Sequence, residues 1–430
     1  MRQMKASGNV WYGKIPQNWE TKRLKYFFKF CKGLPITKDN LIDQGLPVIS
    51  YGQIHAKTNN GVDVRPHLLR FVDFSYQTFY PLSQVMRGDF VFADTSEDYD
   101  GCGNCVYKRN DSLLFAGYHT IIAHSIIESD NRFFAYLFLT DIWRRQIREK
   151  VFGVKVFSIT QKTLSNSYII LPPLAEQQRI ADFLDSECGK IDGLKADIQA
   201  QIDTLEQYKR SVITEAVTHG LHPSAPMKEC SVSWARQIPQ HWKVMPNKHL
   251  MTKIKNICPI YRGEDILSLT MYGVIVRDLD AGGKMPSSFD GYQYIKKGNL
   301  LMCLFDIDVT PRCIGIIKQN GITSPAYSQF KMRKIANARF YYYYYLMLDY
   351  TKELLHLAKN LRHSLTEDQL GSIKQLVPPL DEQQEIADYL DNKCAEIEQI
   401  IADKKSQIET LENYKKSLIY EYVTGKKEVV

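Results

Sequence analysis

The sequence lacks the features that mark several classes of protein. No apolar run approaches the roughly 20 residues that a bilayer span needs, and the start MRQMK is followed by polar residues rather than by the apolar part of a secretion signal. Of nine cysteines only Cys102 and Cys105 are closely spaced, and no second pair completes a zinc site. The odd cysteine count favours free thiols in a reducing compartment. We therefore expect a cytoplasmic protein with no membrane span and no metal.

The marks of catalysis are also missing. The sequence contains no G-x-x-x-x-G-K-[ST] loop, no glycine-rich strand–helix turn, no H-E-x-x-H and no N-P-P-[YF] stretch of the kind that suggests a DNA methyltransferase. Acidic clusters at residues 97–100 and 306–308 have no lysine or histidine in a nuclease-like arrangement. His119, His124 and His363 have no spacing that makes a ligand set. These absences predict a chain that binds no cofactor and is not an enzyme.

An internal repeat is the strongest feature of the sequence. PPLAEQQRIADFLDS begins at Pro172 and PPLDEQQEIADYLDN at Pro378, and 27 of 47 positions are identical when residues 172–218 are aligned with 378–424. A weaker echo relates WYGKIPQNW at residues 11–19 to WARQIPQHW at residues 234–242. The chain is thus organised as a variable block (1–171), a repeat (172–220), a second variable block (221–377) and a second repeat (378–430).

Both repeats predict long helices. Proline and an early glutamate are typical of a helix start, and apolar residues then recur every seven positions, which is a coiled-coil pattern. The predicted seam consists of Leu184, Ile191, Ile198, Leu205 and Val212 in the first helix and Leu390, Ile397, Leu411 and Leu418 in the second. The positions between are assigned to Leu194, Ile202 and Tyr208, and to Ile400, Ile401, Ile408 and Tyr414, while Lys404 interrupts the second seam.

Neither helix can bury its apolar stripe alone. Because both stripes occur in one chain at similar length, we expect the two helices to pair with each other, the alternative being homodimerisation through one helix. The pattern does not fix the direction of pairing. We expect an antiparallel pair, because it would carry the two variable blocks to opposite ends.

Charge is divided unevenly along the chain. The net charge is +7 for residues 1–171 and +9 for residues 221–377, but −4 for residues 172–220 and −5 for residues 378–430. Basic globular blocks are typical of proteins that bind the phosphate backbone of nucleic acid. Acidic helices would be a poor groove for DNA and a reasonable surface for docking proteins.

Each variable block shows the same coarse order of elements. Short strands are predicted at residues 47–51, 89–93 and 118–123, followed by a helix over 131–150, a loop near 157–160 and a strand at 168–171. The second block has strands at 266–270, 299–303 and 328–332, a helix over 337–359, a loop at 361–365 and a strand at 373–377. The tyrosines of residues 341–345 are assigned to a buried helix face with some phenols facing solvent. The predicted fold class is α+β: two mixed α/β domains separated by two long helices that form an antiparallel coiled coil, with a pseudo-twofold internal repeat.

The duplicated opening P-P-L-x-E-Q-Q-x-I-A-x-[FY]-L-D resembles the central repeats of specificity subunits from type I restriction–modification systems. The segments at residues 11–19 and 267–274 are similar to other family segments. The resemblance implies that each variable block is a target recognition domain for one half of a bipartite, asymmetric site in double-stranded DNA, and that the helices set the spacing. It also implies docking to two adenine methyltransferase subunits and to restriction (translocase–nuclease) subunits of a prokaryotic cytoplasm. S-adenosylmethionine, ATP and Mg²⁺ would then be bound by those partners and not by this chain.

The residues that read bases can only be ranked, by polar or basic character beside turns. The candidates are Tyr51, Gln53, His55, Lys155 and Ser158 in the first block and Thr270, Tyr272, Arg277, Arg362, His363 and Ser364 in the second. Arg and Lys suit guanine edges and Gln suits adenine, although phosphate contact is the commoner role of a basic residue. Three alternatives stay open: a stand-alone coiled-coil DNA-binding repressor, an enzyme with an unrecognised site, and a scaffold with no role in nucleic-acid binding.

Overall fold

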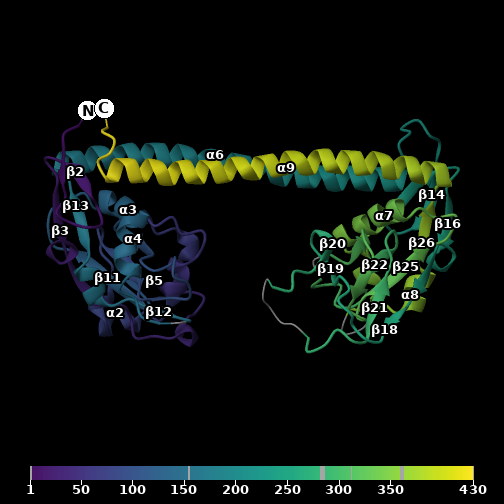
Figure 1. Cartoon of the computed structure of the whole chain (residues 1–430), viewed down its shortest axis with the longest axis horizontal. Coiled ribbons are helices and arrows are strands. Elements are labelled where there is room, and N and C mark those ends of the chain that lie inside the picture. The colour runs from purple at the N-terminus through teal and green to yellow at the C-terminus, as the bar shows by residue number, and fades with distance from the viewer. Residues whose placement is uncertain (1, 154, 281–285, 311, 359–362, 430) are drawn as a thin grey trace. The chain divides into compact units, whose positions relative to one another are not determined.

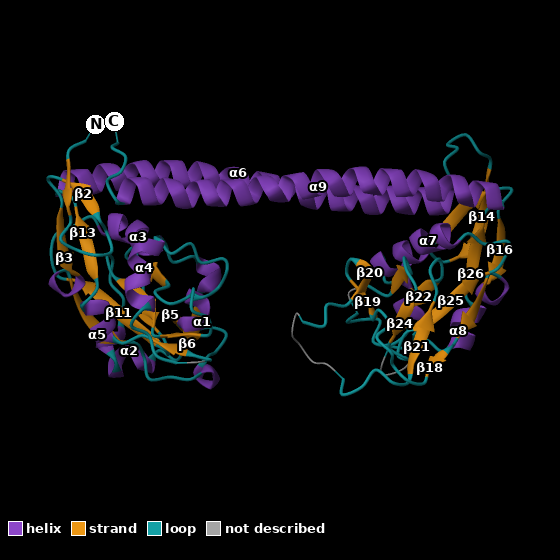
Figure 2. Ribbon diagram, in the orientation of Figure 1, coloured by secondary structure: helices purple, strands orange, loops and turns teal. Residues whose placement is uncertain are grey.

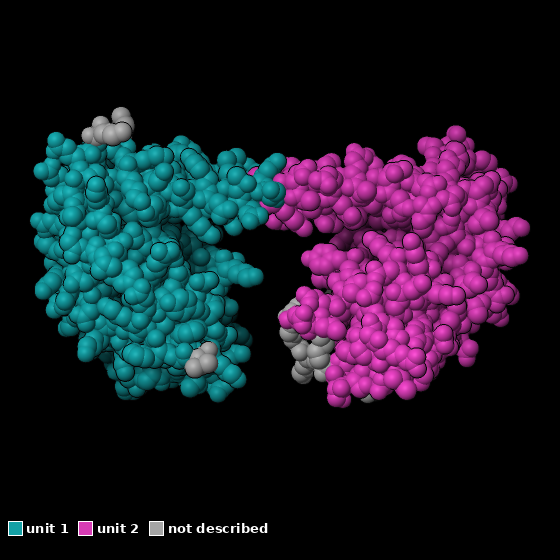
Figure 3. All heavy atoms as spheres, viewed as in Figure 1, with its two compact units in different colours: residues 1–197, 406–430 teal, residues 198–405 magenta. Residues whose placement is uncertain are grey.

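The computed structural model describes residues 2–429 except residue 154, residues 281–285, residue 311 and residues 359–362. The chain divides into two compact units, each with its own core (Figure 3). Unit 1 comprises residues 1–197 and 406–430, and unit 2 comprises residues 198–405. Each unit therefore contains one variable block together with part of both repeats.

Unit 1 is built around a four-stranded antiparallel sheet with the strand order β4-β11-β7-β9. These strands are β4 (Phe28–Lys32), β7 (Phe90–Ala93), β9 (Cys105–Tyr107) and β11 (Thr120–Ser125). Strand β11 is labelled in Figure 2. A second sheet contains β5 (Leu46–Ile49), β6 (Arg70–Val72) and β10 (Phe115–Ala116), in which β10 runs parallel to β5. Three strand pairs complete the unit: β1 (Met4–Ala6) with β2 (Lys14–Pro16), β3 (Glu20–Arg23) with β13 (Tyr168–Leu171), and β8 (Thr95–Ser96) with β12 (Phe157–Ser158).

Unit 2 repeats the topology of the main sheet although its block differs in sequence. Its main sheet has the order β17-β25-β22-β23, with β17 (Met251–Ile254), β22 (Leu300–Met302), β23 (Ile314–Ile316) and β25 (Ser328–Met332). A second sheet contains β18 (Ile257–Cys258), β21 (Tyr292–Ile295) and β24 (Gly321–Thr323). The remaining pairs are β14 (Met227–Val232) with β15 (Ala235–Pro239), β16 (Lys243–Pro246) with β26 (Lys374–Val377), and β19 (Leu267–Thr270) with β20 (Gly273–Val276). In both main sheets the first strand in the chain pairs with the last, so the two blocks share one fold.

The helices of the two blocks correspond in part. Unit 1 contains α1 (Tyr51–Ile54), α2 (Ser75–Phe79), α3 (Asn131–Leu139), α4 (Asp141–Arg148) and α5 (Gln161–Ser165), and unit 2 contains α7 (Ala338–Tyr350) and α8 (Glu367–Ser372). Short 3-10 helices cover Leu24–Tyr26, Lys38–Asn40, Pro66–Leu68, Pro81–Ser83, Asn247–His249 and Glu353–Leu357. The predicted single helix over 131–150 is wrong, because Thr140 has an extended backbone and separates α3 from α4. Two other expectations also change: Tyr51 begins α1 rather than ending a strand, and α7 stops at Tyr350 instead of reaching residue 359.

The two repeats form the long helices α6 (Leu174–His219) and α9 (Leu380–Val423), which run antiparallel as predicted. Within unit 1 the ribbons of α6 and α9 lie side by side (Figure 1). There Lys415 of α9 contacts Asp192 of α6 at 2.7 Å, and Lys195 contacts Glu412 at 2.8 Å. In unit 2, Lys209 contacts Glu398 at 2.5 Å. In each unit, contacts further along α6 are made by residues of α9 with lower numbers, which is the pattern of an antiparallel pair.

The seam is narrower than the sequence suggested. Leu184, Ile191, Leu390, Ile397 and Leu418 are buried, and Ile198, Leu205, Val212 and Leu411 are half-buried. Four of the residues assigned between them are exposed, which corrects that assignment: Leu194, Tyr208, Ile400 and Tyr414. Their place in the seam is taken by smaller or polar side chains that share the helical spacing: Cys188, Lys195, Cys394 and Lys209. Lys404 does enter the seam, where its Nζ donates to Gln201 Oε1 at 2.5 Å.

The repeated motif fastens each block to its own long helix through a buried glutamine. Gln177 in the first turn of α6 accepts a hydrogen bond from the backbone N–H of Asp130 at 3.1 Å, at the start of α3. Gln383 of α9 makes the same contact with the backbone N–H of Asn337, at 2.8 Å and at the start of α7. Each glutamine therefore fixes the N-terminus of a block helix against the long helix.

An ion-pair network reinforces this attachment in unit 1. The carboxylate of Asp185 on α6 accepts from Arg109 at 2.5 and 3.0 Å, from Arg132 at 3.1 Å and from the Tyr136 hydroxyl at 2.7 Å. Arg132 also donates to Asp182 at 2.6 Å. Burial alone would raise the pKa of Asp185, but these donors lower it, so the carboxylate stays ionised.

Unit 2 repeats the network with the corresponding residues. Arg339 of α7 donates to Asp391 at 2.5 Å and to Asp388 at 2.7 Å, and Tyr343 donates to Asp391 at 2.8 Å. Some of the acidic charge of the helices is therefore neutralised within the chain and is not available to a partner.

The similar segments at residues 11–19 and 234–242 contain the tryptophans that pack against the C-terminal ends of the two long helices. Gly220 follows α6 with φ +78°, and a Cβ at this position would lie 3.3 Å from Trp242. Gly425 follows α9 with φ +70°, and its Cβ would lie 3.1 Å from Trp19. Both helices thus end on a left-handed glycine packed against a buried tryptophan, and both the positive φ and the close approach favour glycine at this position.

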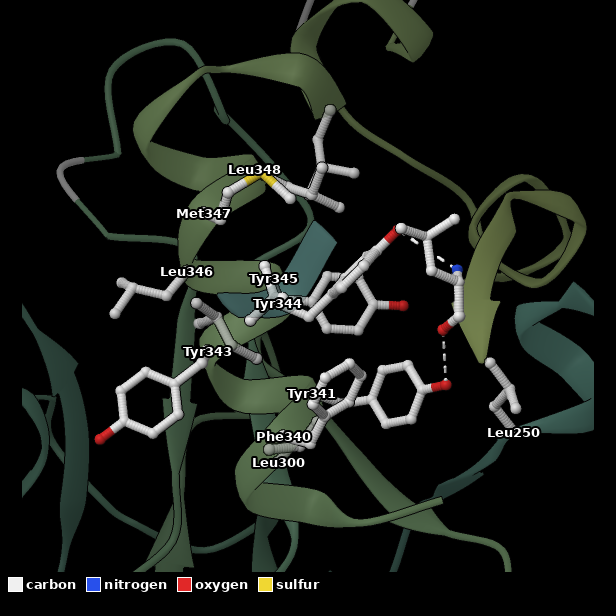
Figure 4. Packing of buried hydrophobic residues seen from close by; sticks show 14 of the residues in the cluster. Leu250, Leu300, Phe340, Tyr341, Tyr343, Tyr344, Tyr345, Leu346, Met347 and Leu348 are labelled. Atoms are coloured by element: carbon white, nitrogen blue, oxygen red, sulfur yellow. Dashed lines mark hydrogen bonds between the residues drawn. The ribbon is translucent and has the colours of Figure 1, made fainter. Parts of the chain in front are cut away.

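The tyrosine run of residues 341–345 lies in the core of unit 2 (Figure 4). Four of its members are buried and only Tyr342 is half-buried, so the expected solvent-facing phenols are not found. Their hydroxyl groups are satisfied internally: Tyr341 donates to the carbonyl of Leu376 at 3.0 Å, and Tyr345 donates to Asn247 at 2.6 Å. This satisfaction makes burial of four phenols possible. Among the described residues, no helix is long and apolar enough to cross a membrane.

Candidate nucleic-acid interface

The first candidate group lies on α1, at the end of the strand β5. Ser50 is the N-cap residue of this helix, and its backbone N–H donates to Gln53 Oε1 at 3.2 Å. Both ring nitrogens of His55 are also engaged: Nε2 donates to the Thr95 carbonyl at 2.8 Å, and Nδ1 accepts from Asn104 at 3.1 Å. Gln53 and His55 were selected as polar residues near a turn. The structure shows that their side chains also make internal hydrogen bonds that hold the surface around α1.

Tyr51 is the centre of an aromatic cluster. Its ring meets the rings of Tyr118 and His119 edge-on at centroid distances of 5.6 and 5.4 Å, and that of His55 at 6.3 Å. Burial raises the pKa of Tyr118, so its phenol is a neutral hydrogen-bonding group. We call Tyr51, His55, Tyr118 and His119 the tyrosine–histidine cluster.

His119 is a candidate that the sequence did not single out for DNA binding. Its backbone is left-handed, with φ +53°, which is rare for a residue other than glycine and is found at sites where the surrounding structure imposes strain. Its side chain is 57% exposed, and Nδ1 lies 3.3 Å from Asp94 Oδ1. No pattern in the sequence announces a positive φ, so only the structure could reveal this residue.

The structure brings the later loop of unit 1 to the same place. Ser158 on β12 pairs with Thr95 on β8, and Thr95 contacts both His55 and His119. Lys155 is exposed beside this strand. Residues more than 100 positions apart in the chain therefore form one surface around Thr95.

In unit 2 the early candidates lie on the hairpin β19–β20. Thr270 Oγ1 accepts from the backbone N–H of Tyr272 at 3.2 Å and donates to the Gly273 carbonyl at 3.0 Å, which fixes the turn. Tyr272 is 86% exposed at the tip. Arg277 is half-buried, and its backbone N–H donates to the Ile266 carbonyl at 2.7 Å.

The later candidates of unit 2 surround a second strained backbone. His363 has φ +44°, its carbonyl accepts from Ile307 N–H at 3.2 Å, and its Nε2 lies 3.9 Å from Asp308. Ser364 is half-buried. Arg362 lies outside the described residues.

The two later loops occupy equivalent positions. The backbone N–H of Ile159 donates to the Asp94 carbonyl at 2.7 Å, and that of Leu365 donates to the Leu304 carbonyl at 2.8 Å. Asp94 and Leu304 both follow the second strand of their main sheet. The loop at residues 155–158 and residues 363–364 therefore lie at the same edge of the main sheet in their units, with different side chains.

The early candidate segments also match. The strand β5 pairs in parallel with β10, through Val48 and Phe115, and Ile266 forms a parallel bridge with Ile322 of β24. The chain then turns into α1 in unit 1 and into the hairpin β19–β20 in unit 2. One scaffold thus presents two different surface structures at the same position.

The described residues offer no site for a metal. No group of three or more His, Cys, Asp or Glu side chains among them is arranged to hold an ion. The acidic cluster near residue 98 is part of a turn, in which Asp98 Oδ1 accepts from the N–H of Gly101 at 2.5 Å. The surface can supply hydrogen-bond donors and acceptors, exposed aromatic rings and cations, which are the groups that contact DNA.

Comparisons with known proteins agree with this fold. The family model described as the type I restriction modification DNA specificity domain matches residues 16–204 and 314–410, about two thirds of the chain. The specificity subunit of the type I restriction enzyme MjaVIII from Methanocaldococcus jannaschii is 23% identical over 96% of this chain and 94% of its own length. That of EcoKI from Escherichia coli is 24% identical over 57% of this chain and 50% of its own length. A chain in a solved structure concerning complex assembly and conformational transition of the type I R-M system has a TM-score of 0.69, with 15% identity over 96% of this chain and 99% of that chain.

Proposed function

The chain belongs to the family of type I restriction modification DNA specificity domains, and from this premise we propose that each variable block reads one half of a bipartite, asymmetric DNA site. Its role within a restriction–modification system is recognition of DNA sequence and not catalysis. The two blocks would be the target recognition domains, and the long helices would connect them.

One observation carries this proposal: the two blocks keep the same main-sheet topology but differ at equivalent surface segments. A shared fold with unlike surfaces is what two readers of unlike half-sites require, because base readout depends on side chains while the scaffold only positions them. A palindromic reader would instead be expected to repeat its surface residues. The different segments at α1 and at the hairpin β19–β20 support this interpretation.

The side chains available in each unit suit contacts in the grooves of duplex DNA. In unit 1 we assign such contacts to the tyrosine–histidine cluster with Ser158 and Lys155. In unit 2 we assign them to Tyr272, Thr270 and Arg277, with the loop at residues 362–364. Each good base contact would contribute about 1–3 kcal/mol of discrimination against a wrong base.

We further propose that α6 and α9 set the separation of the half-sites. A helix of 46 residues is about 69 Å long at about 1.5 Å per residue, and successive turns of duplex are about 34 Å apart. Both helices pass from one unit into the other. Their antiparallel pairing would then give one chain the pseudo-twofold character that a dimeric reader has.

The partners follow from the same proposal. The chain would dock two adenine methyltransferase subunits that use S-adenosylmethionine, and restriction subunits that use ATP and Mg²⁺, in a prokaryotic cytoplasm. This chain would bind none of these cofactors itself.

The test is methylation mapping in a host that lacks other adenine methylation. Expression of the chain with its methyltransferase partner should yield one bipartite motif with two unlike halves, and omission of the chain should abolish it. Specific DNA binding by the isolated chain, with no methylation in the presence of the methyltransferase, would instead identify a stand-alone repressor. Methylation of a palindrome would contradict the assignment of one half-site to each block.

A further inference from the structure

Each unit has a surface hollow where its block meets the start of its own long helix. In unit 1 a hollow of about 680 Å³ lies between the turn before β7, the start of α3 and the first turn of α6. In unit 2 a hollow of about 1050 Å³ lies between the turn before β22, the start of α7 and the first turn of α9. Neither hollow includes a residue that we assigned to DNA reading.

The two hollows occupy equivalent positions in the fold and share the same rim. The turn at the rim contains Gly88 in unit 1, whose N–H donates to the Lys108 carbonyl at 2.8 Å. In unit 2 it contains Gly298, whose N–H donates to the Ile317 carbonyl at 2.8 Å. Both glycines have a positive φ, +95° and +88°. The hollow is therefore repeated even though it is lined partly by blocks whose sequences differ.

One exposed leucine lines each hollow. Leu174 and Leu380 occupy the same position of the repeated motif and are 36% and 49% exposed. Neither belongs to the core clusters of the described residues. A leucine that is retained in both copies and packs in neither core is a candidate for burial by a partner.

Cations surround these leucines at matching positions. Arg87 and Lys297 precede the rim glycines, and Arg109 and Lys318 follow the equivalent strands β9 and β23. Arg87 is exposed and makes a long contact of 3.5 Å with Asp111, and Lys297 and Lys318 are exposed. Arg109 is occupied by Asp185, so the available positive charge is chiefly that of Arg87 in unit 1 and of the two lysines in unit 2.

Repetition indicates which kind of partner fits. A DNA site with two unlike halves requires unlike surfaces, whereas two copies of one protein require two like surfaces. We propose that the hollows are the docking sites for the two copies of the methyltransferase subunit. Each hollow would receive a segment that presents an apolar side chain to the leucine and a carboxylate to the rim cations. This inference rests on the proposed function, because the proposed function supplies the partner that is present in two copies.

The variants Leu174→Asp and Leu380→Asp test the proposal, singly and together. An aspartate in the first turn of a helix is favourable for the helix dipole, so these variants should fold. The complex with the methyltransferase subunit would be purified and its mass measured by light scattering. We expect two copies on the unaltered chain, one copy on each single variant and none on the double variant.

Matched controls are available on the same helices. Leu194 and Ile400 are exposed and lie outside both hollows, so Leu194→Asp and Ile400→Asp should each retain two copies. Arg87→Glu should weaken binding at one of the two sites about tenfold and leave the other unchanged. Melting temperature and helical circular dichroism of the chain alone would verify that each variant is folded.

The outcomes separate this inference from the function on which it rests. If the unaltered chain binds no methyltransferase subunit, the proposed function fails. If it binds two copies and the folded double variant also binds two, the hollows are not the docking sites. If the double variant keeps both copies of the methyltransferase subunit but binds DNA more weakly, the hollows contact DNA and the inference is overturned.

Discussion

The hydroxyl of Tyr136 on α3 donates a hydrogen bond to the carboxylate of Asp185 on α6 at 2.7 Å. The same relationship recurs between Tyr343 and Asp391 at 2.8 Å. The acidic residues of the repeated motif thus hold the variable block that precedes them. The repeat attaches two different blocks to a common pair of helices, and this attachment explains why the motif is copied where the blocks are not.

Replacing Asp185 with alanine should destabilise unit 1. The change would leave Arg109 and Arg132 partly buried without their shared acceptor, and removing one partner of such a pair costs about 3 kcal/mol. Asp203→Ala is the control, because Asp203 is exposed on the same helix and, among the described residues, has a hydrogen bond only from Gln199 at 2.9 Å. Thermal unfolding should show a lower first transition for Asp185→Ala alone, and equal transitions for both variants would argue against the anchoring role.

Stability should depend on pH through His124. Its Nδ1 lies 2.7 Å from the buried carboxylate of Asp89, and this hydrogen bond raises the pKa of His124 above its ordinary value of about 6.5. The protonated form is therefore favoured by folding, so the stabilisation is complete below about pH 6.5 and is lost as pH rises through the folded pKa. The melting temperature of the chain should exceed that of His124→Gln most at pH 5.5, and the difference should shrink toward pH 9. A difference that is independent of pH would contradict the assignment.

Base reading can be tested one unit at a time. His119→Ala should relax or weaken recognition of one half-site, and Tyr272→Ala that of the other, each by about 1–3 kcal/mol and without loss of melting temperature. Tyr208→Ala is a matched control, because this tyrosine is exposed on α6 and belongs to neither group of residues assigned to DNA reading. Methylation of libraries with randomised half-sites would measure the effect. If both variants altered the same half-site, the division of labour between the blocks would be wrong.

Arg362 is predicted from the sequence to contact DNA, and Arg362→Ala should lower affinity while the assembly with methyltransferase stays intact. A contact with phosphate would also reduce the salt dependence of binding by about one counterion. Equal affinity of variant and parent across a salt titration would count against this contact.

The spacer can be changed by lengthening both helices. Because α6 and α9 are antiparallel, an insertion in one helix alone would displace every later contact between them. Insertion of one heptad after Gln201 and one after Lys404, which contact each other, keeps the register of the seam. The added length of about 10 Å corresponds to about three base pairs of duplex at about 3.4 Å each. Methylation mapping should then show a longer spacer between unchanged half-sites, and altered half-sites would refute the ruler.

The sequence determined the organisation of this protein. The copied motif, the seven-residue period and the alternation of basic and acidic segments predicted two α+β blocks and a pair of long helices, because repeats and periodicity are local properties of a chain. The antiparallel direction of the pair was chosen on another ground, the placement of the two blocks at opposite ends. The family could be recognised from the same motif. The side chains between the predicted seam positions were assigned less well, since Leu194 and Ile400 are apolar but lie on the exposed side of their helices.

Only the tertiary structure decided which residues meet. Thr95, Ser158 and His119 are far apart in the chain and become neighbours because β8 pairs with β12 and because the backbone of His119 adopts a positive φ. The contacts of Asp185 could not be predicted from the sequence either. A carboxylate on a helix has the same sequence pattern whether it faces solvent or three hydrogen-bond donors. Periodicity fixes the face of a helix on which a residue lies, but the long-range pairing of strands and helices fixes what that face contacts.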